Sequence, residues 1–164
     1  MAMNMMFSSL FGVGYAIVRY RKNGVLKRFK ATPVTAFQFL SAQLVSRLFL
    51  IMMTSAIVLF GAMKIVGFQM QGSYWLLFSH LAVGACCMIS LGLAVASRIA
   101  SEELAEGILN LMTWPMMFLS GIWFSLDGAS KAITSVASVF PLTHIVSGSR
   151  QIMIEGATMS HLAP

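Results

Sequence analysis

The sequence has few charged residues. Asp, Glu, Lys and Arg make up 10% of its 164 residues, whereas hydrophobic residues make up 58%. A soluble domain carries about 25% charged residues. A chain of this length cannot bury so large an apolar fraction in one core, so a water-soluble fold is excluded. Together with a mean hydropathy of +0.82, the composition predicts an all-α, polytopic membrane helix bundle.

Cysteine and acidic residues are also scarce. Cys86 and Cys87 are adjacent inside an apolar run, and without a Cys-x-x-Cys spacing or a second pair they form no zinc site, so they are interpreted as packing residues. Eleven Lys and Arg against five Asp and Glu give a net charge of +6. The basic residues cluster beside apolar segments, so membrane orientation explains them, and nucleic acid is not expected as a partner.

Six of the eleven basic residues lie between residues 19 and 33, between two apolar segments. Short loops rich in Lys and Arg stay on the cytoplasmic side of a membrane. Within this stretch, Val25, Leu26 and Phe29 fall on one side of a helix. The rest of its circumference carries Lys27, Arg28 and Lys30. The stretch therefore predicts a short amphipathic cytoplasmic helix.

Glycine and proline mark the ends of this predicted helix. Gly24 can open it, and Thr32 followed by Pro33 predicts an N-cap and the first position of the next helix. Two interpretations of the helix are compatible. Its basic face can lie on the anionic headgroups of the membrane lipid, or its apolar face can dock into a groove of a cytoplasmic partner.

Four apolar segments predict membrane spans, at 1–18, 47–66, 74–97 and 108–124. About 20 residues are needed to cross the hydrocarbon core, so the first span is slightly short or begins upstream. The segments between and after the spans are expected to be a cytoplasmic coupling and interfacial region at 19–46, a cytoplasmic turn at 98–107, and outer helices with the start of a missing last span at 125–164. Small residues such as Gly84 and Gly92 predict close helix packing.

Several polar residues have a structural and a functional interpretation. For His80, a hydrogen bond at a helix interface is favoured over a functional role within the span. Glu102, Glu103 and Glu106 could serve acid–base chemistry or bind a cation. Carboxylates at this position are more typical of the start of a helix, where the dipole favours negative charge.

Pro115 interrupts the segment 108–124 and predicts a kink, because it removes a backbone donor. Neighbouring Thr and Ser side chains can satisfy the carbonyl that it frees. A kinked helix with small polar residues can line a translocation path across the membrane. The candidate translocation residues are Asn110, Pro115, Ser120 and Gly121.

Three motifs resemble the membrane subunit of type-2 ATP-binding-cassette (ABC) transporters. The run at 22–33, Lys-Asn-Gly-Val-Leu-Lys-Arg-Phe-Lys-Ala-Thr-Pro, is similar to the coupling segment of that family. Residues 106–124 resemble its fifth span, with the pattern Pro-x-x-x-x-Ser-Gly-x-x-Phe from Pro115. Pro141-Leu142-Thr143-His144 with Arg150 resembles the entry to its sixth span. The family has six spans, so the chain is expected to be a fragment that comprises spans two to five.

The resemblance implies a permease subunit of an exporter in the inner (plasma) membrane, working with a second permease copy as a homodimer or heterodimer. The residues that would contact a cytoplasmic ABC ATPase subunit are Gly24, Val25, Leu26, Lys27, Arg28, Phe29, Thr32 and Pro33. ATP and magnesium would bind in that partner, so no cofactor and no enzymatic activity are expected in this chain. The sequence lacks the Gly-x-x-x-x-Gly-Lys-[Ser/Thr] motif that binds nucleotide phosphates, which agrees with ATP binding in the partner. The implied substrates are amphiphiles such as drugs, lipids or polysaccharides.

Two other functions are alternatives to an ATP-driven permease. An ion-coupled transporter or channel would need acidic residues within its spans, but all five carboxylates fall outside the predicted ones. A membrane serine protease could use Ser120 as nucleophile and His144 as base. The Gly-x-Ser-Gly pattern of rhomboid-like enzymes is broken here by Phe118.

Overall fold

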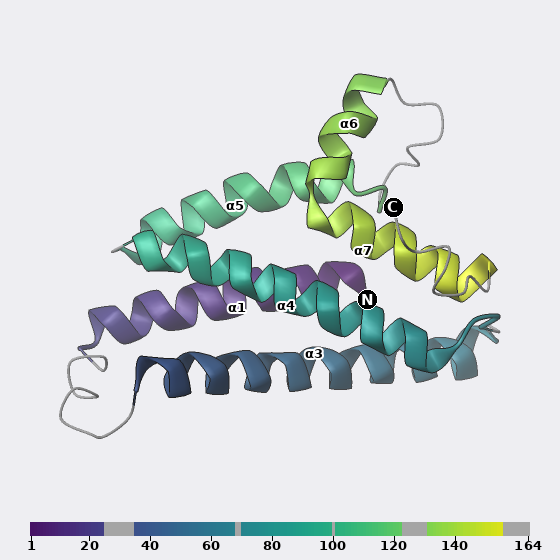
Figure 1. Ribbon diagram of the computed structural model, residues 1–164, viewed down its shortest axis with the longest axis horizontal. Helices are drawn as coiled ribbons and strands as arrows, with labels where there is room; N and C mark the ends of the chain where they lie inside the picture. Colours follow the sequence, from purple (N-terminus) through teal and green to yellow (C-terminus); the bar gives the residue numbers. More distant parts are fainter. Residues whose placement is uncertain (25–34, 68–69, 100, 123–130, 156–164) are drawn as a thin grey trace.

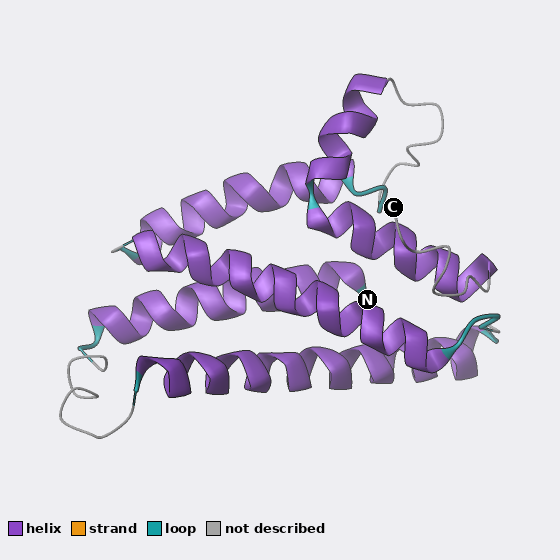
Figure 2. Ribbon diagram, in the orientation of Figure 1, coloured by secondary structure: helices purple, strands orange, loops and turns teal. Residues whose placement is uncertain are grey.

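The computed structural model of the chain describes residues 1–24, 35–67, 70–99, 101–122 and 131–155. In this part of the chain the regular structure is helical, without strands (Figure 2). The helices are α1 (Ala2–Lys22), α3 (Ala36–Val66), α4 (Tyr74–Arg98), α5 (Glu102–Leu119), α6 (Lys131–Val139) and α7 (Pro141–Arg150), followed by the single turn η1 (Gln151–Glu155). The all-α prediction is confirmed.

The four long helices run alternately in opposite directions (Figure 1). Helix α1 lies among the others and contacts α3, α4, α5 and α7. The basic end of α1, the start of α3, the end of α4 and the start of α5 therefore lie at one end of the molecule, which we call the basic end. The 25–34 segment, on which the predicted coupling helix falls, lies outside the described residues, so that helix stays a prediction.

Glycines allow the central helices α1 and α4 to approach closely. A Cβ atom placed on Gly92 of α4 would lie 3.1 Å from the carbonyl oxygen and 3.3 Å from the Cα of Leu10 in α1. A Cβ on Gly84 would lie 2.7 Å from Cγ1 of Ile145 in α7. Both glycines are buried, so the prediction of close packing at these small residues is confirmed.

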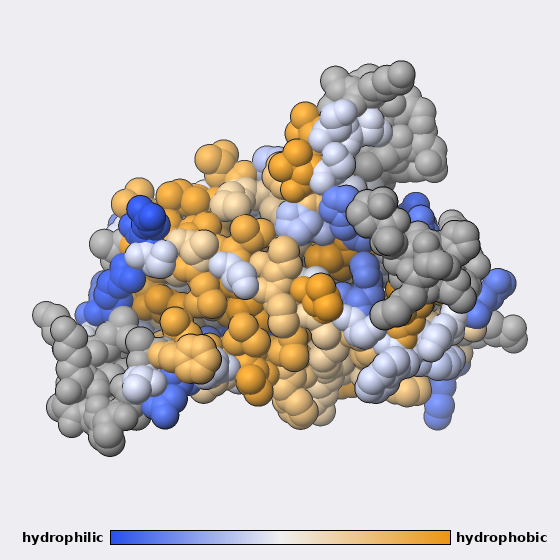
Figure 3. Space-filling model, viewed as in Figure 1, coloured by the Kyte–Doolittle hydropathy of each residue, from blue (hydrophilic) through white to orange (hydrophobic). Residues whose placement is uncertain are grey.

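Helix α3 lies at the periphery, and much of its apolar surface faces outward. The large exposed apolar side chains in its middle are Val45, Phe49, Leu50, Met53, Ile57, Val58 and Phe60. Within the described residues, Phe37–Val66 and Tyr74–Arg98 are long and apolar enough to cross a membrane. Figure 3 shows apolar surface over the middle of the molecule and hydrophilic residues toward both ends. This distribution suits a membrane protein; the four-span arrangement stays a prediction.

Helix α3 begins later than the sequence analysis predicted. Thr35 is extended and caps the helix: its hydroxyl accepts from the Gln38 amide at 3.3 Å, and the Gln38 side-chain oxygen accepts from the Thr35 amide at 2.9 Å. The predicted start of this helix at Pro33, after a Thr32 cap, is wrong for α3, which starts at Ala36; Thr32 and Pro33 themselves lie outside the described residues. This reciprocal capping box satisfies the backbone donors of Thr35 and Gln38, and the Thr-x-x-Gln spacing is its sequence signature.

Two other helix starts follow the sequence analysis. The Ser101 hydroxyl accepts from the Leu104 amide at 3.3 Å, and Glu102 and Glu103 lie in the first turn of α5, which confirms the favoured helix-end role of these carboxylates. Helix α7 begins with Pro141 at its first position and ends at Arg150, as predicted.

Candidate functional site

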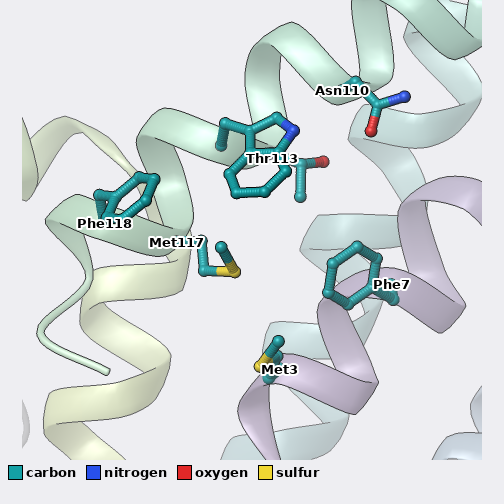
Figure 4. Close-up of a pocket in the computed structure, with 7 residues that line it drawn as sticks. Met3, Phe7, Asn110, Thr113, Met117 and Phe118 are labelled. Carbon is teal, nitrogen blue, oxygen red and sulfur yellow. The ribbon is translucent and has the colours of Figure 1, made fainter. Parts of the chain in front are cut away.

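A cavity of about 390 Å³ lies between the start of α1 and the second half of α5. It is lined by Met3, Phe7, Asn110, Thr113, Trp114, Met117 and Phe118. Figure 4 shows Met3 and Phe7 of α1 facing Thr113 and Met117 of α5. Along α5, the lining residues recur at helical spacing from Asn110, so one face of this helix forms the wall.

The cavity wall is apolar apart from two side chains. Trp114 and Phe118 are stacked with ring centroids 5.9 Å apart. Thr113 is only 2% exposed, and its hydroxyl has no hydrogen-bond partner within the described residues. Asn110 is half-buried at the same wall. A buried hydroxyl without a partner is costly, so Thr113 offers a hydrogen bond to a molecule that enters the cavity.

The four candidate translocation residues occupy different places. Asn110 lines the cavity, whereas Pro115 is exposed within α5, which continues to Leu119. Ser120 is buried and donates to the Met117 carbonyl oxygen at 3.0 Å. Gly121 has a φ of +75° and follows the end of the helix. The structure thus brings only Asn110 to the cavity.

The expected repair at Pro115 does not occur through its Thr and Ser neighbours. The carbonyl freed by Pro115 is that of Leu111. Ser120 donates to the Met117 carbonyl oxygen instead, and the Thr113 hydroxyl has no partner among the described residues. The proline motif does not predict Thr113 and Trp114 as site residues; the signal for them is their helical spacing from Asn110 along the lining face of α5.

Of the predicted ATPase-coupling residues, the structure describes only Gly24, which follows the end of α1. Gly24 has a φ of +66°, which favours glycine after α1. The other coupling residues, which lie outside the described part of the chain, are Val25, Leu26, Lys27, Arg28, Phe29, Thr32 and Pro33.

The two histidines within the described residues lie close to backbone carbonyls. His80 Nε2 lies 3.4 Å from the Ile145 carbonyl oxygen, which confirms its predicted role at a helix interface. His144 Nε2 lies 2.8 Å from the Ser138 carbonyl oxygen, while Ser120 donates elsewhere. The structure therefore shows no nucleophile–base pair between Ser120 and His144. Within the described residues, no group of three or more His, Cys, Asp and Glu could hold a metal ion.

Comparisons with known proteins agree on one class. The family described as ABC-2 type transporter matches residues 1–154. The inner membrane transport permease YhhJ of Escherichia coli is 23% identical over 145 residues, covering 88% of this chain and 39% of YhhJ. The putative transport permease YvfS of Bacillus subtilis is 25% identical over 160 residues, covering 94% of this chain and 63% of YvfS. The chain thus spans less than two thirds of these relatives. No solved structure matches it.

Proposed function

Since the chain belongs to the ABC-2 type transporter family, we propose that it is part of the permease subunit of an ATP-driven exporter for amphiphilic substrates. A second permease copy completes the transporter in the inner (plasma) membrane. The energy comes from a separate cytoplasmic ATPase, which binds ATP and magnesium. The curated relatives are named transport permeases, which supports this reading.

The cavity between α1 and α5 carries the proposal for the substrate class. Trp114 and Phe118 provide an aromatic wall for the apolar part of a substrate. Thr113, with its unpartnered hydroxyl, provides a hydrogen bond for a polar group. Pockets of this kind combine apolar walls with a few polar groups that fix orientation. The lining therefore favours an amphiphile, such as a drug or a lipid.

The contacts at the basic end support a mechanical link between the ATPase and this cavity. Arg21 at the end of α1 donates to the carbonyl oxygen of Ile99, directly after α4. Helix α5 begins three residues later, at Glu102, and carries one wall of the cavity. A push on the 25–29 segment by the closing ATPase would reach α5 as a rigid-body movement of packed helices.

The experiment is co-purification of the full-length gene product with the ATPase encoded beside it, followed by assay of ATP hydrolysis. We expect Leu26→Asp and Phe29→Asp to abolish association, because each places a charge on the apolar face of the predicted coupling helix. Leu104→Asp is the matched control, since Leu104 is 63% exposed and lies in the first turns of α5.

Two outcomes would contradict the proposal. One is a loss of association in Leu104→Asp equal to that in Leu26→Asp. The other is the absence of any associated ATPase together with transport driven by a proton or sodium gradient, which would favour an ion-coupled transporter.

A further inference from the structure

A second cavity, of about 570 Å³, lies between α1 and α3 near the basic end. We call it the α1–α3 cavity, and it is lined by Phe11, Gly12, Tyr15, Ala16, Arg19, Tyr20 and Arg47. Two of its lining side chains are cationic and none is acidic. The cavity between α1 and α5, which we call the α1–α5 cavity, differs in charge, because none of its lining side chains is charged.

Two contacts between antiparallel helices frame the α1–α3 cavity. At one end, Arg47 donates from Nη2 to the Gly12 carbonyl oxygen at 2.8 Å. At the other, the rings of Tyr20 and Phe39 meet edge to face, with centroids 5.7 Å apart. The two contacts are eight residues apart along each helix, or about 12 Å at the rise of an α-helix. This spacing leaves room for a small headgroup between them.

Gly12 allows Arg47 to lie against α1. A Cβ atom on residue 12 would lie 2.7 Å from Nη1 and 2.9 Å from Cζ of Arg47. Because residue 12 has no side chain, the guanidinium packs on the backbone of α1 at a half-buried position. The guanidinium of Arg47 is thereby held at the end of the cavity that the Arg47–Gly12 contact forms.

Within the described part of the chain, both arginines keep donors that no protein group uses. Arg47 donates to the Gly12 carbonyl oxygen, and among the described residues neither Arg47 nor Arg19 has a carboxylate partner. A guanidinium has five N–H donors, so, as far as the described residues go, most donors of Arg47 and all donors of Arg19 are available to a ligand. Arginine binds phosphate oxygens in a bidentate manner.

Glu106 of α5 lies near the Tyr15 side chain but does not line the cavity. The Tyr15 ring contributes to the cavity wall, and Arg19 and Arg47 supply the charge of the lining.

We propose that the α1–α3 cavity binds the phosphate of an anionic phospholipid headgroup, at the end of the bundle predicted to face the cytoplasm. Basic pockets between membrane helices on this side bind such headgroups. The neighbouring surface of α3 favours a lipid over free phosphate, because Val45 and Phe49 are 62% and 66% exposed and can contact acyl chains. This lipid site is separate from the α1–α5 cavity. Lipid binding there does not depend on which substrate is exported.

The test is native mass spectrometry of the full-length gene product in mild detergent, titrated with phosphatidylglycerol or with phosphatidylcholine of the same acyl chains. We expect phosphatidylglycerol to bind more tightly. Arg19→Gln and Arg47→Gln should each lower its affinity about fivefold, the contribution of one basic residue near a membrane surface. Arg47→Lys should lose less, since it keeps the charge.

Arg98→Gln is the matched control, because Arg98 is exposed in the last turn of α4 and does not line the cavity. Its phosphatidylglycerol affinity should match wild type. Arg19→Gln removes no hydrogen bond to a described residue, so it tests the site even if Arg47→Gln fails to fold. Equal affinity for the two lipids, an equal loss in Arg98→Gln, or displacement of phosphatidylglycerol by equimolar inorganic phosphate would each overturn the proposal.

Discussion

Arg21 donates from Nη1 to the carbonyl oxygen of Ile99, 78 residues later in the chain, at 3.0 Å. Its Nη2 also lies 3.4 Å from the Ser97 carbonyl oxygen. The last carbonyls of a helix have no partner within it, and the helix dipole favours a cation there. One member of the basic stretch thus caps α4, in addition to any part in membrane orientation.

The cap should contribute to stability. Arg21→Gln shortens the side chain and removes the charge, so we expect the free energy of unfolding to fall by about 1 kcal/mol, the lower part of the range for charged hydrogen bonds, because Arg21 is exposed to solvent. The measurement is thermal unfolding of the full-length protein in detergent. Lys22→Gln is the control, and equal destabilisation by both substitutions would contradict a specific cap.

The contact between α1 and α4 should not accept a larger residue at position 92. Gly92→Ala places a methyl group against the backbone of Leu10, which cannot move independently of α1, so we expect a loss of about 1–3 kcal/mol. Gly107→Ala is the matched control, because nothing lies within 4 Å of that Cβ position. It should stabilise α5 by up to about 1 kcal/mol. A neutral Gly92→Ala would show that the helices can separate without cost.

Position 148 should be coupled to His80. A Cβ atom on Gly148 of α7 would lie 2.6 Å from Nε2 of His80, so Gly148→Ala is expected to destabilise the α4–α7 contact. His80→Ala removes the obstructing ring, and Gly148→Ala should then cost at least about 0.5 kcal/mol less. The midpoints of thermal unfolding of the four proteins in this cycle measure the coupling. Strictly additive effects would refute it.

The unpartnered hydroxyl of Thr113 gives a prediction in the absence of substrate. Thr113→Val keeps the shape and removes the hydroxyl, so stability should rise by about 1 kcal/mol. Ser90→Ala is the control, because the exposed Ser90 hydroxyl already bonds the Cys86 carbonyl oxygen at 2.8 Å. Thermal unfolding in detergent distinguishes them. A fall in the stability of Thr113→Val would mean that this hydroxyl is satisfied in the protein.

Local patterns in the sequence determined the helical class and several helix ends. Apolar runs of membrane length admit only helices in a chain without barrel periodicity. Pro141 marks the start of α7, and the carboxylates at 102 and 103 mark the start of α5, because caps and dipoles act within one turn. The start of α3 is set by a local signal also, the capping box of Thr35 and Gln38, which places the first helical residue at Ala36 and not at the predicted Pro33.

Only the tertiary structure decided which residues share a site. Thr113 faces Phe7 across the α1–α5 cavity, and Arg47 meets Gly12 across α1 and α3. These pairs depend on which helices become neighbours and in which register, and hydropathy patterns do not encode either. In a membrane, nearly every apolar face of a helix can point either to lipid or to another helix, because lipid is as apolar as a protein core. Close contacts at glycines and bonds from arginines to backbone carbonyls select one packing among them.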